Sequence, residues 1–380
     1  MKNILIYIDW FTPAYKAGGP IQSLQNLIDK MGDHFNFDII TSDKDIDGIP
    51  LKIDCRNKWF ISENARIIYI SKKIGLLKEI KECHSSRKYS YIYINSMYSF
   101  WYSILPILYY AISGSRSKIV LAPRGMLQNG ALKTKYIKKR IFLSLFRLSG
   151  LHKRLIFHAT DPQEQNDIKK IFGNNVKVFN AANFINIPTL SYKRQIKEKH
   201  KANFIFISVF SRKKNLGFFL ELLSSIKGSV KLDIFGYVKD TGYFEECISI
   251  INKLPANIIV SVKNVVKHYQ VFEEISNHDF FVLPTLGENY GHAIFESLVV
   301  KRPVLISDQT PWNNIESQRA GWSISLSDRV KWIDTIQKCV DIDNQEYQNL
   351  CEGAGCLAKD YIEKNNPVND YKKLFTDAGS

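Results

Sequence analysis

Residues 279–307 contain the pattern that narrows the possible folds furthest. An apolar strand is followed by a loop with two glycines, then by a helix that ends at residue 300, and then by a second apolar strand at residues 303–307. The first strand covers residues 279–284 and the helix covers 293–300. Two strands joined by one helix predict a parallel β–α–β unit, because such a crossover returns the chain to the same edge of a sheet. The segment therefore favours an α/β fold with a parallel sheet.

The same alternation runs through both halves of the 380-residue chain, which is long enough for two full cores. Residues 188–202 are polar and lysine-rich without an apolar period, so they predict a linker. We expect domains over residues 1–187 and 203–358, followed by a helical segment over 359–380 with a break near Pro367. Further strands are predicted at residues 4–8, 37–41, 66–70, 91–94, 119–122, 155–158, 176–179, 203–209, 231–235 and 258–262. Helices are predicted at residues 216–226, 243–251 and 269–275.

The net charge of +15 is unevenly distributed. Residues 83–160 contain no Asp or Glu but 13 Lys and Arg. Within them, basic and apolar residues mix at helical spacing, which predicts a basic amphipathic helix suited to an anionic membrane surface. The alternative is a solvated basic helix whose apolar face packs in the core. The basic positions are Lys133, Lys135, Lys138, Lys139, Arg140 and Arg147.

Other classes of protein fit the chain poorly. The basic segment lacks a zinc-finger or RNA-recognition signature, so we expect no nucleic-acid partner.

Residues 89–115 carry no charge, but Asn95, Pro106 and Gly114 interrupt them. A strand and a short helix at 100–112 are therefore favoured over a transmembrane span. The first residues are typical of a buried strand rather than a signal peptide. The six cysteines have no metal-ligand spacing and predict free thiols in the cytoplasm.

Two carboxylates mark the strand–loop–helix segment as a candidate site. Glu288 falls in the loop and Glu296 falls inside the helix. Open α/β sheets bind ligands at the carboxyl ends of their strands, and a helix N-terminus suits a phosphate group. Gly291 would let the backbone approach a ligand closely. The arrangement predicts a site for a nucleotide diphosphate with one carboxylate at each end, and the alternative is a solvated helix with two Glu residues.

This run, continued through Trp312, resembles retaining glycosyltransferases of family 4, whose signature is a Glu, seven residues and a second Glu. The resemblance covers essentially the whole chain. It implies the GT-B fold, in which two Rossmann-like domains face each other across a cleft and a C-terminal helix returns to the first domain. It also implies that Glu296 binds the nucleotide ribose and that Glu288 contacts the donor sugar. The backbone N–H groups of Asn289, Tyr290 and Gly291 would face the sugar or the β-phosphate.

The basic loop after the first strand of the second domain also matches the family in part. By resemblance, Lys214 would neutralise the leaving diphosphate, helped by Arg212. The family's usual Arg falls on Val209, whose side chain cannot donate a hydrogen bond. Because cations and a helix N-terminus fill the role of a metal ion, we expect no metal and no cofactor besides the donor. A solvated basic turn is the alternative for this loop.

Two further segments lie in the first domain. Gly18 and Gly19 resemble the family's N-terminal loop, which borders the donor diphosphate and the acceptor, although an ordinary turn would also fit. Arg124 follows a strand where the family places an Arg or His near the reaction centre, so it would contact a phosphate or the acceptor. Residues 183–184 read Asn-Phe where the family often has Asn-Gly.

The resemblance implies a retaining, metal-independent hexosyltransferase. It would move a sugar from a nucleotide-diphosphate sugar to a polyprenyl-diphosphate-linked glycan in lipopolysaccharide (O-antigen) or capsule biosynthesis. Such a protein would be cytoplasmic and peripheral on the cytoplasmic face of the inner membrane. Two alternatives remain: a nucleotide-sugar epimerase, and a catalytically inactive GT-B scaffold, which Val209 favours.

Overall fold

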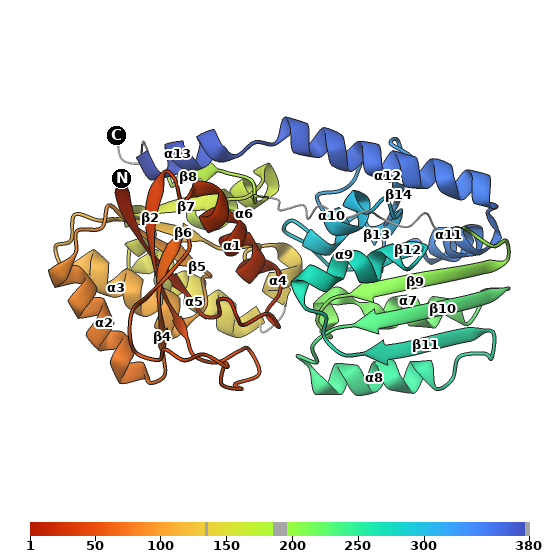
Figure 1. Cartoon of the computed structure of the whole chain (residues 1–380), viewed down its shortest axis with the longest axis horizontal. Coiled ribbons are helices and arrows are strands. Elements are labelled where there is room, and N and C mark those ends of the chain that lie inside the picture. Colours follow the sequence, from red (N-terminus) through yellow and green to blue (C-terminus); the bar gives the residue numbers. More distant parts are fainter. Residues whose placement is uncertain (134–135, 185–195, 377–380) are drawn as a thin grey trace. The chain divides into compact units, whose positions relative to one another are not determined.

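The chain forms two compact α/β units (Figure 1). The computed structural model describes residues 1–133, 136–184 and 196–376. One unit combines residues 1–186 with residues 366–380, and the other comprises residues 187–365. Of the predicted linker, residues 188–195 lie outside the described part, and its last two residues already belong to a strand.

The first unit is built on an eight-stranded sheet in the order β3-β4-β2-β1-β5-β6-β7-β8. All pairings are parallel except that of β3 with β4, at one edge. The central β1 is apolar on both faces, as expected of a parallel strand covered by helices on both sides. The strands are β1 (Lys2–Ile8), β2 (Phe35–Ser42), β3 (Phe60–Ser62), β4 (Ala65–Ile70), β5 (Tyr91–Asn95), β6 (Lys118–Ala122), β7 (Leu155–Ala159) and β8 (Lys177–Asn180).

Helices cover both faces of this sheet. Ile4 and Ile6 of β1 pack with α1 (Gly19–Met31) and α13 (Val368–Thr376). Leu5 and Tyr7 face the opposite side. The elements on that side are α2 (Lys73–Ser86), η1 (Phe100–Ile104), α3 (Leu105–Ile112), α5 (Tyr136–Leu148), η2 (Leu151–Arg154) and α6 (Pro162–Phe172), while α4 (Asn129–Lys133) precedes α5.

The chain returns to the first unit at its end, as predicted. Tyr371, Leu374 and Phe375 of α13 are buried in its core, and the Phe375 ring lies 5.6 Å from that of Tyr91. The returning segment was predicted from residue 359, but residues 359–364 still belong to the preceding helix of the second unit. The break falls around Pro367, since proline lacks the N–H that would continue the helix.

The second unit contains a six-stranded, fully parallel sheet in the order β11-β10-β9-β12-β13-β14. Its strands are β9 (Lys201–Ile207), β10 (Ser229–Phe235), β11 (Ile258–Lys263), β12 (Phe280–Leu283), β13 (Val304–Ser307) and β14 (Gly321–Ile324). Its helices are α7 (Leu216–Leu223), α8 (Thr241–Ile251), α9 (His268–Ser276), α10 (His292–Val299), α11 (Arg329–Asp341) and α12 (Asn344–Lys364). The predicted Rossmann-like architecture of both halves is confirmed.

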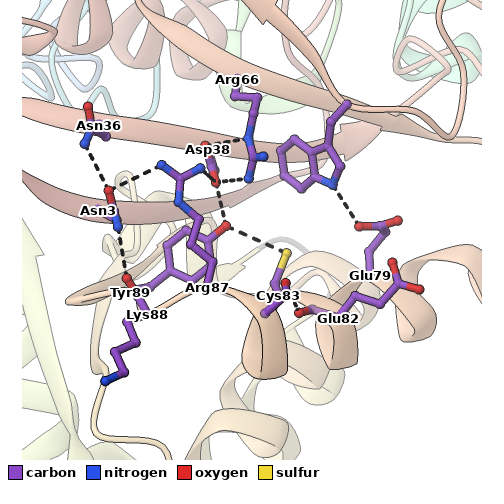
Figure 2. Close-up of polar contacts among 12 residues, drawn as sticks. Asn3, Asn36, Asp38, Arg66, Glu79, Glu82, Cys83, Arg87, Lys88 and Tyr89 are labelled. Carbon is purple, nitrogen blue, oxygen red and sulfur yellow. Dashed lines mark hydrogen bonds and ion pairs between the residues drawn. The ribbon is translucent and has the colours of Figure 1, made fainter.

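A buried ionic cluster ties strands and helices of the first unit together (Figure 2). The Asp38 carboxylate of β2 accepts hydrogen bonds from Arg66 at 2.6 Å, from Arg87 at 2.7 Å and from the Tyr89 hydroxyl at 2.5 Å. The Arg66 guanidinium also stacks 4.6 Å from the Trp59 ring. Because these partners come from β4, the end of α2 and the approach to β5, the cluster fixes their mutual register.

The uncharged stretch at residues 89–115 forms β5, η1 and α3, as predicted. Throughout the described ranges, no helix combines the length and the apolar character needed to cross a bilayer.

Candidate functional site

Loops at the carboxyl edge of the second unit's sheet form the candidate site. The loop after β9 spans residues 208–215 and includes the short helix η3 (Arg212–Lys214), and the loop after β12 spans residues 284–291. Since β9, β12 and β13 are parallel neighbours, their following loops emerge side by side. Residues far apart in the sequence therefore meet at this edge.

Lys214 and Glu288 meet as a largely buried ion pair, with the Lys214 ammonium directly on Oε1 of Glu288. The Thr285 hydroxyl lies 3.1 Å from the same oxygen. Burial raises the pKa of the Glu288 carboxyl, but the charges of Lys214 and Lys213 outweigh it, so that the pKa lies below its ordinary value. The carboxylate is thus ionised near neutral pH and held in one place.

Hydrogen bonds join the loops that carry this pair. The Leu286 N–H donates to the Lys213 carbonyl at 2.7 Å, and the Glu288 N–H donates to the Gln309 carbonyl at 2.9 Å. The Ser307 hydroxyl donates to the Thr285 carbonyl at 2.5 Å. Neither Thr285 nor Gln309 was predicted from the sequence. A small hydroxyl residue between an apolar strand and Gly287 was the signal available for Thr285.

Gly291 caps α10 in the left-handed conformation, with a φ of 76°. A Cβ at this position would lie 2.8 Å from Cδ1 of Ile294, so a side chain would crowd the first turn. The N-terminus of α10 directly follows the loop that holds Glu288. Glu296 lies about one turn into the helix and is buried. This geometry agrees with the predicted loop-and-helix placement of the two carboxylates.

Asn289 is half-buried, and Tyr290 is turned into the core. The Tyr290 ring lies 5.9 Å from Trp312 and 6.1 Å from Tyr361. The Trp312 indole N–H donates to the Tyr290 carbonyl at 2.6 Å. The Tyr290 side chain therefore stabilises the loop, and the ligand contact predicted for its backbone N–H stays a prediction.

Arg212 does not join the Lys214–Glu288 pair. Its guanidinium is exposed and binds Glu246 at 2.5 Å, with Asp240 at 4.0 Å. The Glu246 hydrogen bond raises the pKa of Arg212. Val209 is half-buried at the position of the family's usual Arg. Of the cations in this loop, Lys213 rather than Arg212 acts on Glu288 together with Lys214.

Arg124 follows β6 in the first unit and has a φ of 54°, in the left-handed region. Its guanidinium donates to Oδ1 of Asn183 at 2.7 Å, to Oδ1 of Asn95 at 2.9 Å and to the Tyr93 hydroxyl at 2.9 Å. These partners are neutral, so the positive charge is oriented by amide and hydroxyl oxygens rather than neutralised by a directly bonded carboxylate.

A directional chain of hydrogen bonds continues from Tyr93. Burial lowers the pKa of His158 to about 3, so the ring is neutral at physiological pH. Its Nε2 lies 2.9 Å from the Ala181 carbonyl, which can only accept. The proton therefore resides on Nε2, and Nδ1 accepts the Tyr93 hydroxyl at 2.7 Å. Tyr93 in turn accepts from Arg124, so His158 determines the orientation of Tyr93 beneath Arg124.

The Asn-Phe departure at residues 183–184 has a structural reason. Asn183 accepts from Arg124, as described above, and the Phe184 ring stacks 5.0 Å from Tyr371 of α13. A glycine at position 184 would lose this contact with the returning helix.

Gly18 and Gly19 lie between β1 and α1 of the first unit. Gly18 has a φ of 69°, and a Cβ there would meet no atom within 4 Å, so the position is open. Gly19 is the first residue of α1. The preceding turn is held by Asp45, which accepts from the backbone N–H groups of Tyr15 at 3.1 Å and Lys16 at 3.3 Å.

The basic positions predicted for the membrane face differ in their surroundings. Lys138, Arg140 and Arg147 are exposed on α5. Lys139 points inward instead, where its ammonium lies 2.5 Å from the Ala131 carbonyl and 5.2 Å from the centre of the Tyr98 ring. Lys133 is the last residue of α4, and Lys135 lies outside the described residues.

No group of three or more His, Cys, Asp or Glu side chains that could hold a metal ion occurs within residues 1–133, 136–184 and 196–376. The prediction that the reaction needs no metal stays a prediction.

Comparison with known proteins relates this architecture to glycosyltransferases. The family model described as "Glycosyl transferases group 1" matches residues 201–341, which include Lys214, Glu288 and Glu296. The second unit therefore carries a glycosyltransferase domain. A search among curated proteins gave no match.

Solved structures similar to this chain have the GT-B fold, which confirms the predicted fold. Sucrose-phosphate synthase from Thermosynechococcus elongatus aligns with a TM-score of 0.77 at 13% identity over 99% of both chains. HepE from Anabaena, solved with UDP and glucose, aligns at 0.68 and 13% identity over 98% of both chains. TarM from S. aureus, solved with UDP, α-GlcNAc-glycerol and Fondaparinux, aligns at 0.68 and 13% identity over the full length of both.

Proposed function

We propose that this protein is a family 4 glycosyltransferase that moves a sugar from a nucleotide-diphosphate sugar to a glycan acceptor. The observation that carries the proposal is the Lys214–Glu288 pair beside the N-terminus of α10, with Glu296 buried further along that helix. Cations, a helix N-terminus and carboxylates thus converge at one edge of a parallel sheet. A nucleotide sugar requires this combination, because its diphosphate is anionic and its ribose and sugar hydroxyls donate hydrogen bonds.

Each residue has a chemical task in this proposal. Glu296 accepts from the ribose hydroxyls, and Glu288 accepts from hydroxyls of the donor sugar. Lys214 binds the diphosphate, with Lys213 adding positive charge in place of the Arg212 predicted from sequence. When the bond between the sugar and the diphosphate breaks, negative charge grows on the leaving oxygen, and these cations and the α10 N-terminus lower the energy of that state.

The first unit supplies the acceptor side in this proposal. Arg124 carries a positive charge and donates hydrogen bonds to the neutral oxygens of Asn183, Tyr93 and Asn95, which suits a phosphate of the acceptor. We further propose a polyprenyl-diphosphate-linked glycan as acceptor, in O-antigen or capsule assembly at the cytoplasmic face of the inner membrane. The donor is bound without a metal ion, because Lys214, Lys213 and the helix N-terminus offset its charge.

Calorimetric binding tests the donor site directly. UDP, GDP, dTDP and their sugars are titrated into the full chain in the presence of a chelator. We expect one nucleotide to bind selectively, and Glu296→Ala and Lys214→Gln to abolish that binding. Glu352→Ala is the matched control, because Glu352 is an exposed carboxylate on α12 of the same unit. Binding that requires added metal would contradict the metal-independent proposal.

Two outcomes would replace the proposal. The absence of nucleotide binding would favour the inactive scaffold, for which Val209 is the relevant residue. Conversion of one nucleotide sugar into its epimer without any acceptor would favour the epimerase.

A further inference from the structure

Helix α5 of the first unit has two apolar faces. Phe142, Leu143 and Phe146 pack against the core under the sheet. On the opposite side, four apolar residues form a stripe that is between 56% and 83% exposed. An ordinary surface helix carries polar residues there, because exposed apolar side chains gain nothing from water. The residues of this outer stripe, at spacings of four, four and three, are Ile137, Ile141, Leu145 and Leu148.

The neighbouring helices repeat this pattern. On η1 and α3 the outward apolar residues are Phe100, Leu108 and Ile112, and Ile112 is 78% exposed. On α2 they are Ile74 and Leu77, and Ile74 is 81% exposed. Each helix thus keeps large apolar groups in water although its inner face is already buried.

Contacts show that these helices form one layer. The inner residues Leu76 of α2, Ile107 of α3 and Phe146 of α5 belong to the same core cluster on one side of the sheet. The Lys73 ammonium of α2 lies 4.9 Å from the centre of the Trp101 ring of η1. Near the other end of the layer, Arg154 of η2 donates to the Ala111 carbonyl of α3 at 2.6 Å. The exposed residues therefore lie on the outward surface of a single layer of helices.

The charge of this layer is one-sided. Residues 83–160, which include η1, α3, α5 and η2, contain no acidic residue. Exposed cations Lys138, Arg140 and Arg147 flank the outer stripe of α5. On α2, Glu82 pairs with Lys78 at 3.3 Å, and Glu79 accepts from the Trp59 indole. The outward surface thus combines apolar groups with an excess of positive charge.

We propose that the outward surface of α2, α3 and α5 docks on an anionic phospholipid bilayer. Apolar side chains of the stripes enter the boundary between head groups and acyl chains, while the lysine and arginine side chains stay among the head groups. Charge complementarity selects this occupant over a second copy of the chain, since two such surfaces face to face would repel each other. No helix needs to cross the membrane in this arrangement.

This surface names the residues that would hold the proposed transferase at the membrane, but it rests on observations independent of the transferase chemistry. Nucleotide binding by the second unit and vesicle binding by the first are separate measurements, so either can fail while the other holds.

Vesicle flotation with the purified full chain tests the proposal. Phosphatidylcholine vesicles are compared with vesicles that contain roughly 30% phosphatidylglycerol, at about 0.1 M and about 0.5 M salt. We expect binding to the anionic vesicles at low salt, and weaker binding at high salt and on neutral vesicles. Combined substitution of Lys138, Arg140 and Arg147 by Gln should weaken binding about 100-fold, because each cation near an anionic surface contributes roughly one factor of five.

A second variant addresses the apolar contribution. Ile141→Ser with Leu145→Ser should weaken binding about tenfold or more, since two side chains no longer enter the apolar boundary. The matched control is Ile259→Ser with Val262→Ser, two exposed apolar residues on β11 of the second unit. The control for the loss of three charges replaces three exposed lysines of the second unit by Gln. These are Lys227, Lys231 and Lys253.

Several results would overturn the proposal. Equal binding by the stripe variant and its control would show that the stripes do not touch lipid. Binding that is equally strong on neutral vesicles would remove the role of charge. Light scattering that shows a dimer in the wild type and a monomer in the Ile141→Ser, Leu145→Ser variant would assign the surface to a second copy. Thermal unfolding at the wild-type temperature is required of every variant, so loss of binding cannot arise from loss of fold.

Discussion

Two buried carboxylates, Asp38 in the first unit and Glu288 in the second, both bind cations but differ in their surroundings. Asp38 is held by Arg66, Arg87 and Tyr89, which lie on strand β4 of its own sheet and between α2 and β5 (Figure 2). Glu288 is held by Lys214 from a loop at the carboxyl edge of a sheet. Burial and ion pairing alone therefore do not mark a functional site.

The position in the fold makes the difference. Asp38 lies within β2, and its bonds fix the register of neighbouring elements. Glu288 lies where the loops after parallel strands converge and where the N-terminus of α10 opens. We therefore expect Asp38 to determine stability and Glu288 to determine activity, and the following measurements test that division.

The largest expected effect is on turnover. Glu288→Gln removes the charge but keeps a hydrogen-bonding group, so nucleoside-diphosphate release from the donor should fall about 10²–10³-fold. The free energy of unfolding should fall by about 1–2 kcal/mol, less than for Asp38, because a single cation loses its partner and the amide of Gln can still accept a hydrogen bond. Turnover and urea unfolding are measured on the same preparation. Wild-type turnover would contradict the assignment of Glu288.

Asp38→Asn should show the opposite profile. In this variant Arg66 and Arg87 lose their carboxylate partner. Both side chains are about one-third exposed and can partly hydrate. We therefore expect the free energy of unfolding to fall by about 3 kcal/mol, which is at the low end for a broken buried ion pair. Donor affinity should be unchanged at a temperature where the variant is folded. Asp334→Asn, at an exposed position on α11, is the control in urea unfolding. A loss no greater than that of the control would remove the structural role assigned to the cluster.

A smaller effect separates His158 from both carboxylates. The folded pKa of His158, about 3, lies below its unfolded value of about 6.5, so the unfolded chain binds a proton first as the pH falls. Stability is therefore lost below pH 6.5, by about 1 kcal/mol per pH unit, until the folded pKa is reached. His158→Gln should lack this part of the slope in unfolding measured from pH 7 to pH 5.

Glu288 acts in another range of pH. The pKa of Glu288 is lower in the folded chain than in the unfolded chain, so this carboxylate stabilises the fold at every pH above its ordinary pKa of about 4.3. That stability is lost only when the pH falls below about 4.3 and toward the folded pKa. An unchanged slope between pH 7 and pH 5 in His158→Gln would contradict the buried, neutral histidine.

The smallest effect concerns Arg212. Because its guanidinium is exposed and bound to Glu246, Arg212→Gln should change donor affinity by no more than about twofold, whereas Lys214→Gln abolishes binding. Isothermal titration with the selected nucleotide compares the two variants. Equal losses would restore the diphosphate clamp predicted from the sequence.

Some features were set by local sequence alone. The strand–loop–helix that carries Glu288 and Glu296 could be predicted because apolar periodicity and glycines act over a few residues. Boundaries were less well predicted: the helix expected at residues 216–226 ends at Leu223, and the strand expected at 203–209 begins at Lys201. These ends depend on packing and pairing with distant elements rather than on local propensity.

Other features were decided by tertiary structure. Lys214 and Glu288 are 74 residues apart and meet because β9 and β12 are neighbours in the sheet. Arg212, two residues earlier, is turned toward Glu246 of α8. On α5, the sequence supplied basic and apolar residues at helical spacing, but only packing against the sheet determined that Phe146 points inward while Ile141 and Leu145 face outward. Periodicity specifies a helix and its faces, whereas contacts between distant segments specify what each face meets.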